Sequence, residues 1–272
     1  MSLPKLGFRW VRRRACSIID GGSTRNSGAR SPRRLILAGT NYPNLIEATE
    51  RAGVPYVLYG NNLVGEPPHG AVDQARSDDA TGAREGVRYL IRLGHRQVCF
   101  IGDISQPWYH VRYKAYLGVM ADAGLEPLAQ TVGLSMDNAR NGYASTEAIL
   151  QRGLSISAIF AGADDVAFGV WEQVRQRGLR IPDDLSLLGF GDMPDAHLME
   201  PPLTTVRIPF LEIGRQLARM AIEKANSPRS PLPETVIPTE LILRGTTWPY
   251  VESGSLAAVG GPETRSRQIG GV

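Results

Sequence analysis

Residues 158–194, AIFAGADDVAFGVWEQVRQRGLRIPDDLSLLGFGDMP, hold a strand, a helix and a second strand in succession. The apolar runs Ala158–Ala161 and Leu185–Phe190 have the length and the bounding residues of buried strands. The stretch 165–177 between them has helical spacing, and Gly178 follows it where a helix favours a left-handed residue. A helix that joins two apolar strands predicts a parallel pair, the repeating unit of an α/β sheet.

The same alternation extends in both directions and predicts the α/β class, with doubly wound parallel sheets covered by helices. The other expected elements are strands at Leu35–Ala38, Tyr56–Tyr59, Gln97–Ile101 and Leu241–Arg244, and helices near residues 43–52, 80–93, 110–123, 142–152 and 209–225. Further glycines, Gly53, Gly124 and Gly153, follow three of these helices. Ligands of such sheets bind beyond the carboxyl ends of the strands, so we expect a binding site in the polar turns found there.

Charge is distributed unevenly along the 272 residues. Residues 1–34 hold nine of the 30 Lys and Arg and one of the 27 Asp and Glu, so the rest has 21 basic and 26 acidic residues, a net charge of −5. The body is therefore not expected to bind nucleic acid through charge. The Gly/Ser/Arg-rich leader has neither a helical nor a strand period, which favours disorder over a phosphate-binding role.

Motifs for catalysis and for metal binding are absent from the sequence. Two cysteines and no Cys/His cluster of ligand spacing predict neither a disulfide framework nor a metal site. No phosphate loop occurs, and Gly189-Phe190-Gly191 lacks the third glycine of a dinucleotide fingerprint. We expect no cofactor and no enzyme, although a triad of distant residues would not be visible here. No membrane span or secretory signal is recognisable, which predicts a cytoplasmic location.

Five segments between residues 35 and 248 resemble the LacI (lactose-repressor) family in order and spacing. They are GTNYPNLIEATERAGVPYVLYGNN, DDATGAREGVRYLIRLGHRQVCFIGD, the 158–194 segment above, PPLTTVRIPFLEIGRQLARMAI and ELILRGTT. The resemblance implies two similar lobes of the type I periplasmic-binding-protein-like fold, which close on a small molecule. It also implies a homodimeric transcription regulator that holds operator DNA through a helix-turn-helix head.

The resemblance also implies a division of the chain. It gives a basic leader at 1–34, a first lobe at 35–96 and 209–233, a second lobe at 97–208 and 234–248, and a flexible tail at 249–272. The head and the first strand–helix units of the family have no counterpart in residues 1–34. We therefore expect an incomplete first lobe, and DNA contact only through the missing head.

Three candidate ligand-binding residues lie in turns of the second lobe. Arg112 matches an arginine that the family uses to bind sugar oxygens, and the alternative is an exposed arginine at a helix start. We expect its replacement to leave stability unchanged. Trp108 is suited either to stack on a sugar ring or to anchor the core. Asp164 matches a family aspartate and is equally suited to cap a helix.

Four further candidates are Asn61, Asn62, Asp78 and Asp192. The two asparagines end a strand at the cleft edge, where turn chemistry alone also favours them. Of Asp78 and Asp79, one is expected to cap the next helix and the other to reach the ligand. Asp192 matches the second of two family acids.

Two departures from the family bear on the ligand. The first of the two family acids is replaced by Gly191, and a family asparagine by Ala163. A missing carboxylate lowers the cost of binding an anion, so the sequence tilts the prediction toward a sugar acid over a neutral sugar. The expected function is a sugar or sugar-acid sensor in a transcription regulator, and the alternative is a periplasmic-type sugar carrier.

Overall fold

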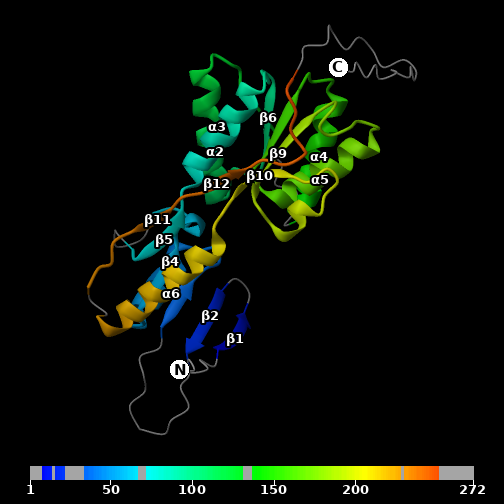
Figure 1. Cartoon of the computed structure of the whole chain (residues 1–272). Helices are drawn as coiled ribbons and strands as arrows, with labels where there is room; N and C mark the ends of the chain where they lie inside the picture. The colour runs from blue at the N-terminus through cyan, green and yellow to red at the C-terminus, as the bar shows by residue number, and fades with distance from the viewer. Residues whose placement is uncertain are drawn as a thin grey trace, which may run out of the picture.

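The structure is a computed structural model that describes residues 8–13, 16–21, 34–66, 72–130, 137–227 and 230–250. Residues 34–250 form two lobes, each with its own sheet (Figure 1). The predicted α/β class with parallel sheets is confirmed. None of the described helices is long and apolar enough to cross a membrane.

The first lobe has a four-stranded sheet in which every pair of neighbours is parallel. Its order is β11 (Thr235–Ile237), β5 (Gln74–Ser77), β4 (Tyr56–Tyr59) and β3 (Leu35–Leu37). Helix α1 (Pro43–Arg51) buries Ile46 against Leu37 and Leu58. Helix α6 (Phe210–Asn226) packs on β3, β4 and β5.

The second lobe has a six-stranded sheet whose central strands are fully buried. Its order is β12 (Glu240–Ile242), β10 (Thr204–Arg207), β9 (Ser186–Gly191), β8 (Ala158–Ala161), β6 (Val98–Ile101) and β7 (Leu128–Gln130). Only β12 runs antiparallel to its neighbour among these strands. Its helices form two contacting pairs, α2 (Asp79–Arg92) with α3 (Pro107–Asp122) and α4 (Asn138–Gln151) with α5 (Asp164–Gln176). Figure 1 shows the two pairs on opposite sides of the sheet.

The glycine signals at helix ends are confirmed. Gly53, Gly124, Gly153 and Gly178 all have positive φ, between 63° and 73°. All six predicted helices are present, and the five predicted strands between Leu35 and Phe190 match β3, β4, β6, β8 and β9 within one residue at each end. The returning strand expected at Leu241–Arg244 is β12, one residue earlier and shorter.

Two of the lobe boundaries differ from the prediction. Helix α2 belongs to the second lobe, because Gly82 and Gly86 bring its backbone against Val206 and Leu188 of that lobe's sheet. Strand β11 belongs to the first lobe, because it pairs with β5. The chain therefore crosses between lobes at residues 77–79, 207–210 and 237–240, and only the second crossing agrees with the predicted division.

The two ends of the chain also depart from the expected division. Strands β1 (Phe8–Arg13) and β2 (Cys16–Gly21) pair antiparallel in a segment for which we predicted no strand, and β2 lies beside β3. The segment does contain residues that favour strands, namely Trp10, Val11, Ile18 and Ile19. The prediction of disorder rested on its high content of arginine, glycine and serine and gave these residues too little weight. At the other end, Tyr250 donates its amide to the Leu93 carbonyl at 2.7 Å, so the second lobe extends to residue 250. The rest of the predicted disorder and of the flexible tail lies outside the described residues.

Candidate functional site

Arg112 lies in the second turn of α3, not in the turn before the helix, and is buried beside the start of α2 and the β8–α5 turn. Its Nε and Nη2 both donate to Asp79 Oδ2, at 2.9 and 2.6 Å, and Nη1 donates to the Gly162 carbonyl at 2.6 Å. The guanidinium also lies 3.9 Å from the centre of the Phe190 ring. Arg112 is only 4% exposed, so the alternative of an exposed helix-start arginine is wrong. These bonds use three of its five N–H groups, and no other residue that the structure describes accepts from the remaining two.

Asp79 extends this contact toward the first lobe. Its Oδ1 accepts the hydroxyl of Ser77 at 2.6 Å, and that hydroxyl lies 3.2 Å from the Tyr59 hydroxyl. Burial raises the pKa of Tyr59 to about 12, which keeps its hydroxyl protonated. Tyr59 and Ser77 end strands of the first lobe, whereas Asp79 opens the second. The polar chain from Tyr59 to Arg112, which we call the crossover network, therefore joins the lobes at their first crossing.

The asparagines and Asp78 brace the backbone around this crossing. Asn61, in the 3-10 turn η1 (Gly60–Asn62), bonds both the amide and the carbonyl of Ser77, at 2.9 and 3.2 Å. Asn62 donates to the Ala38 carbonyl at 3.1 Å. Asp78 caps α2 by accepting the Thr81 amide, which identifies it as the cap of the pair. Any role of these three in ligand binding stays a prediction.

Asp164 lies in the β8–α5 turn and is completely buried. Its Oδ1 accepts the Thr205 hydroxyl at 2.6 Å and its Oδ2 the Met193 amide at 2.7 Å, so it joins the turns after β8 and β9 to strand β10. The N-cap position of α5 is occupied by Ala163, which overturns the capping alternative. Burial, chiefly, raises the pKa of the Asp164 carboxyl.

Asp192 directly follows β9 and has a φ of +56°, a left-handed conformation that aspartate tolerates better than most residues. It accepts Arg207 Nε at 2.7 Å and Arg244 Nη2 at 2.6 Å. These two arginines outweigh the effect of burial and lower the pKa of Asp192. Its carboxylate is thus already engaged on both oxygens within the protein.

Trp108 is half-buried against the second-lobe core, with its ring centre 5.9 Å from that of Tyr109. This contact fits the core-anchor alternative and leaves the stacking role a prediction. Asp79 and Phe190 are the contacts of Arg112 that sequence reasoning missed. A clue existed for Asp79, since one member of the Asp78–Asp79 pair was expected to reach the ligand, but the member chosen as a candidate was Asp78, which caps the helix.

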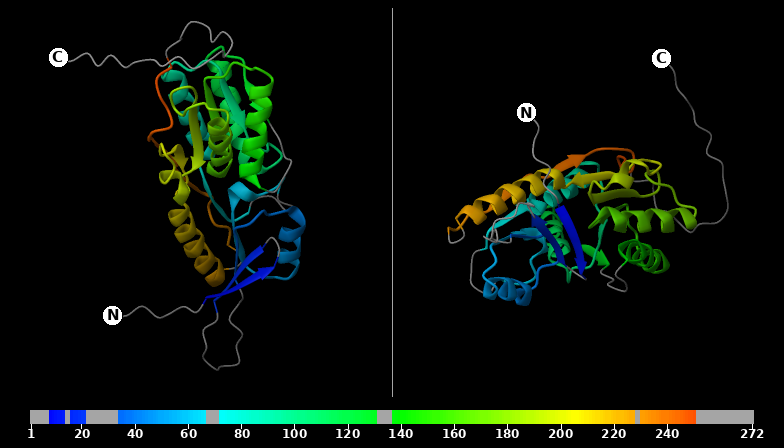
Figure 2. Two further views of the ribbon diagram at one scale, coloured as in Figure 1. Left: turned by 90° about the vertical axis from the view of Figure 1, so that its right-hand side faces the viewer. Right: turned by 90° about the horizontal axis from the view of Figure 1, so that it is seen from below.

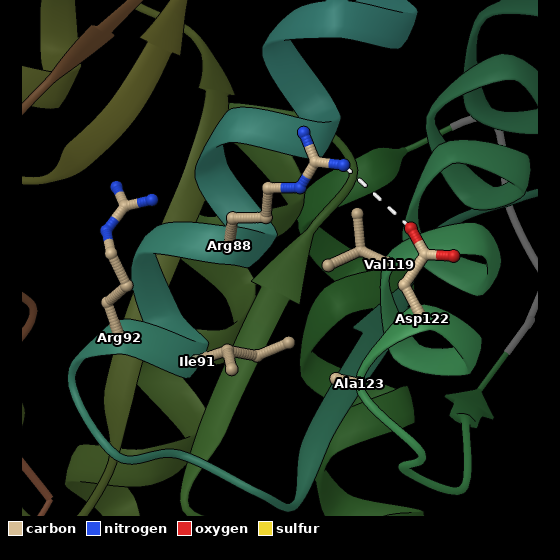
Figure 3. A pocket seen from close by; sticks show the side chains of 6 residues that line it. All are labelled: Arg88, Ile91, Arg92, Val119, Asp122 and Ala123. Atoms are coloured by element: carbon tan, nitrogen blue, oxygen red, sulfur yellow. Dashed lines mark ion pairs between the residues drawn. The ribbon is translucent and has the colours of Figure 1, made fainter.

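A separate hollow of about 290 Å³ lies on the outside of the second lobe between α2 and α3 (Figure 3). Its lining residues are Arg88, Ile91, Arg92, Val119, Asp122 and Ala123. These belong to the last turns of both helices, whereas Asp79 and Arg112 lie toward their first turns. The hollow is therefore not part of the candidate site. The described residues hold no cluster of three or more His, Cys, Asp or Glu suited to a metal ion.

Two lobes joined by three crossings, with polar groups gathered at the strand ends between them, define a two-lobed domain with the architecture of a binding protein. A family model described as a periplasmic binding protein-like domain matches residues 87–247, and the chain belongs to this family. The resemblance to LacI-family regulators is confirmed by the chain's relatives.

Three of these relatives are informative. The transcriptional repressor CytR of Escherichia coli (strain K12) is 26% identical over 214 residues, which cover 78% of this chain and 62% of CytR. The regulator DegA of Bacillus subtilis (strain 168) is 33% identical over 173 residues, which cover 63% of this chain and 51% of DegA. The chain thus spans between a half and two thirds of these relatives' lengths. A solved LacI-family regulator from Enterococcus faecalis V583 with bound ribose has a TM-score of 0.71 at 24% identity, and the match covers 82% of this chain and 80% of that one.

Proposed function

We propose that this chain is the effector-sensing part of a LacI-type transcription regulator, which binds a sugar or sugar acid between its lobes. The observation that carries the proposal is the crossover network, because it couples Arg112, beside the strand ends of the second lobe, to Tyr59 and Ser77 of the first. A ligand that contacts Arg112 would therefore act on the junction between the lobes. The regulator names of the relatives and the ribose in the Enterococcus structure support the same function.

The charges at the strand ends favour a neutral sugar over a sugar acid. Asp79 balances the charge of Arg112, and two arginines already engage Asp192. An anionic ligand would have to compete with Asp79 for the guanidinium, whereas a hydroxyl needs only the N–H groups still free. The balanced charges of Arg112 and Asp192 therefore oppose the tilt toward a sugar acid that the sequence predicts from Gly191.

The remaining parts of the proposal follow from the relatives. Operator DNA would be bound by a helix-turn-helix outside residues 34–250, and the protein would work in the cytoplasm as a homodimer. The bound sugar would be released unchanged, since the proposed role is sensing and not catalysis. Transmission of the signal to DNA would use the change in lobe closure that the ligand favours.

A thermal-shift screen of neutral sugars against the matching sugar acids tests the proposal. We expect a neutral sugar to raise the melting temperature, by an amount that grows with the logarithm of ligand concentration above Kd. Arg112→Lys keeps the charge opposite Asp79 but removes the planar fork of the guanidinium. This variant should weaken the binding free energy of the sugar by about 1–3 kcal/mol and reduce the rise in melting temperature accordingly. A panel in which no sugar or sugar acid stabilises the chain, or one in which the bound sugar is chemically converted, would refute the proposal.

A further inference from the structure

The hollow between the last turns of α2 and α3 combines apolar side chains with arginines. Ile91 of α2 and Val119 of α3 point toward one another across it, and Arg88 and Arg92 stand beside them (Figure 3). Its volume of about 290 Å³ equals that of about ten water molecules at about 30 Å³ each, so several aliphatic side chains would fit. Apolar surface that is open to solvent and bordered by charged residues is typical of a docking site.

The end of α2 that borders the hollow is strongly basic. Residues 88–96 hold Arg88, Arg92 and Arg96 and no acid. Arg88 lies 3.8 Å from Asp122 of α3, and Arg96 donates to backbone carbonyls at the end of α2. Arg92 is exposed and has no ion pair among the residues that the structure describes. The hollow therefore suits a segment that carries an acid close to apolar residues.

The described part of the chain ends beside the same end of α2. Tyr250 donates its amide to the carbonyl of Leu93, the residue after α2, and its ring centre lies 5.5 Å from that of His95. A Cβ at Gly94 would lie 2.9 Å from the Tyr250 carbonyl oxygen. In Figures 1 and 2 this last stretch, in orange, reaches the end of the second lobe farthest from the first. Residue 251 therefore follows at the end of α2 that borders the hollow.

The sequence after Tyr250 has the character that the hollow requires. Residues 251–260 read VESGSLAAVG, in which Glu252 is the one charged residue and Leu256–Val259 is the longest apolar run after Tyr250. At roughly 3.4 Å per residue, the chain from Tyr250 to the start of this run can span up to about 20 Å. Along α2, Arg88–Arg92 cover only about 6 Å, at about 1.5 Å per residue. The apolar run can therefore reach the hollow.

We propose that residues 251–259 of this chain dock in the hollow, with Glu252 paired to Arg92 and the Leu256–Val259 run packed on the apolar side chains. The order along the chain agrees with this arrangement, because Glu252 comes two residues after Tyr250 and the apolar run follows it. Pairing with Glu252 would give Arg92 the partner that the described residues do not supply. Burial of the run would remove the apolar surface of the hollow from water.

The docked segment would fasten the last turns of α2 and α3 to each other. The same two helices carry Asp79 and Arg112 toward their opposite ends. The segment would therefore also brace the helix pair on which the crossover network depends. This docking requires no ligand between the lobes, so it stands apart from the proposed sensing of a sugar.

Zero-length cross-linking of the full chain tests the contact between Glu252 and residue 92. Arg92→Lys keeps the positive charge and supplies an amine, which a carbodiimide joins to a carboxylate only where the two groups touch. We expect mass spectrometry of the single-chain band from a denaturing gel to find an amide bond between Glu252 and the introduced amine. The control Arg219→Lys, at an exposed position of α6 in the first lobe, should form no bond to Glu252. Cross-linking of Glu252 at neither position, or at both alike, would overturn the proposal.

Hydrogen exchange tests the apolar part of the contact. Peptides that cover the last turns of α2 and α3 should exchange about tenfold faster in Leu256→Asp than in wild type, because the segment would no longer protect them. The control Ile269→Asp, at an apolar residue beyond the docking segment, should leave exchange unchanged. Glu252→Arg should have the same effect as Leu256→Asp, and Glu252→Arg combined with Arg92→Glu should reverse it.

Deletion of residues 251–272 distinguishes this occupant of the hollow from any other. The deletion removes none of the described residues, and circular dichroism would check that the shortened chain remains folded. We expect the same faster exchange at the ends of α2 and α3, and its reversal when a synthetic peptide of residues 251–262 is added. Exchange that stays as slow as in wild type would show that this segment does not cover the hollow and would overturn the proposal. None of these results depends on whether the chain binds a sugar.

Discussion

Among single residues, Arg112 and Asp79 are expected to contribute most to stability, because both are buried and each neutralises the charge of the other. Side-chain exposure is 5% for Arg112 and zero for Asp79. Removing one member of such a pair leaves an unbalanced charge out of water. The expectation from sequence that Arg112 is replaceable without loss of stability is therefore withdrawn, since it assumed that no protein group engages the arginine.

Arg112→Leu should lower the free energy of unfolding by about 3–5 kcal/mol, because Asp79 would stay buried without its partner. The double variant Arg112→Leu with Asp79→Leu should recover much of that loss, since no charge is then left behind. Urea denaturation of both variants and of Asp79→Leu alone completes a double-mutant cycle. Additive effects of the two single changes would contradict the coupling.

The raised pKa of Asp164 predicts a pH dependence of the opposite sign to that of most paired carboxylates. Between the unfolded value and the raised folded value, the folded chain binds a proton that the unfolded chain has lost. This residue therefore reduces stability as pH rises through that window. Asp164→Asn should remove this dependence, so its stability relative to wild type should be higher at pH 7 than at pH 4. Exposed Asp195→Asn is the control, and parallel profiles for wild type and Asp164→Asn in urea denaturation would contradict the prediction.

At the scale of elements, the close contact of α4 with α5 depends on two glycines, which have no side chain at the point where the helices meet. A Cβ at Gly169 would overlap the Ala139 carbonyl, and one at Gly142 would overlap the Val166 carbonyl. Both obstructions are backbone atoms, which cannot rotate away as a side chain would. The glycines thus set how closely these two helices approach, and with it the place of the β8–α5 turn that carries Asp164.

Gly169→Ala should destabilise the chain by about 1–3 kcal/mol or more, as expected for overpacking against backbone. Gly118→Ala in α3 is the matched control, since its Cβ would meet nothing within 4 Å. That change should raise stability by up to about 1 kcal/mol through helix propensity. Thermal melts of the two variants provide the comparison. Equal changes in melting temperature would show that the helices α4 and α5 can accommodate a Cβ at residue 169, contrary to the prediction.

Elements with a strong local signal were predictable, and those defined by distant contacts were not. The apolar runs of β4, β6, β8 and β9 and the glycine-terminated helices were all identified from sequence. Strand β5, with the sequence QARS, has no apolar run, and its strand character comes from pairing with β4 and β11. The same rule holds at the candidate site: Arg112 and Asp164 could be chosen as candidates from sequence, but their partners Asp79 and Thr205 lie 33 and 41 residues away and could not.

At the scale of the whole molecule, the two lobes differ in how completely their sheets are covered. Every residue of the central strands β6, β8 and β9 in the second sheet is buried, whereas both central strands of the first sheet, β4 and β5, contain partly exposed residues. Helix pairs cover the second sheet on both sides, and the small first-lobe cluster around Leu37, Ile46 and Leu58 is separate from the main core. The second lobe should therefore be the more stable of the two.

Hydrogen exchange followed by mass spectrometry should resolve this difference within one chain. Amides that open only in global unfolding exchange last, and those released by local opening exchange earlier. We expect peptides from β6, β8 and β9 to exchange slowest and peptides from β3 and β11 to exchange faster by at least tenfold. The crossover network should reduce this difference in exchange rate, because it bonds Ser77 and Tyr59 of the first lobe to Asp79 of the better-packed second lobe. Peptides spanning β4 and β5 should therefore fall between the two extremes and move toward the fast group in Arg112→Leu. Equal protection throughout both sheets would instead mean that the three crossings make the lobes unfold as one cooperative unit.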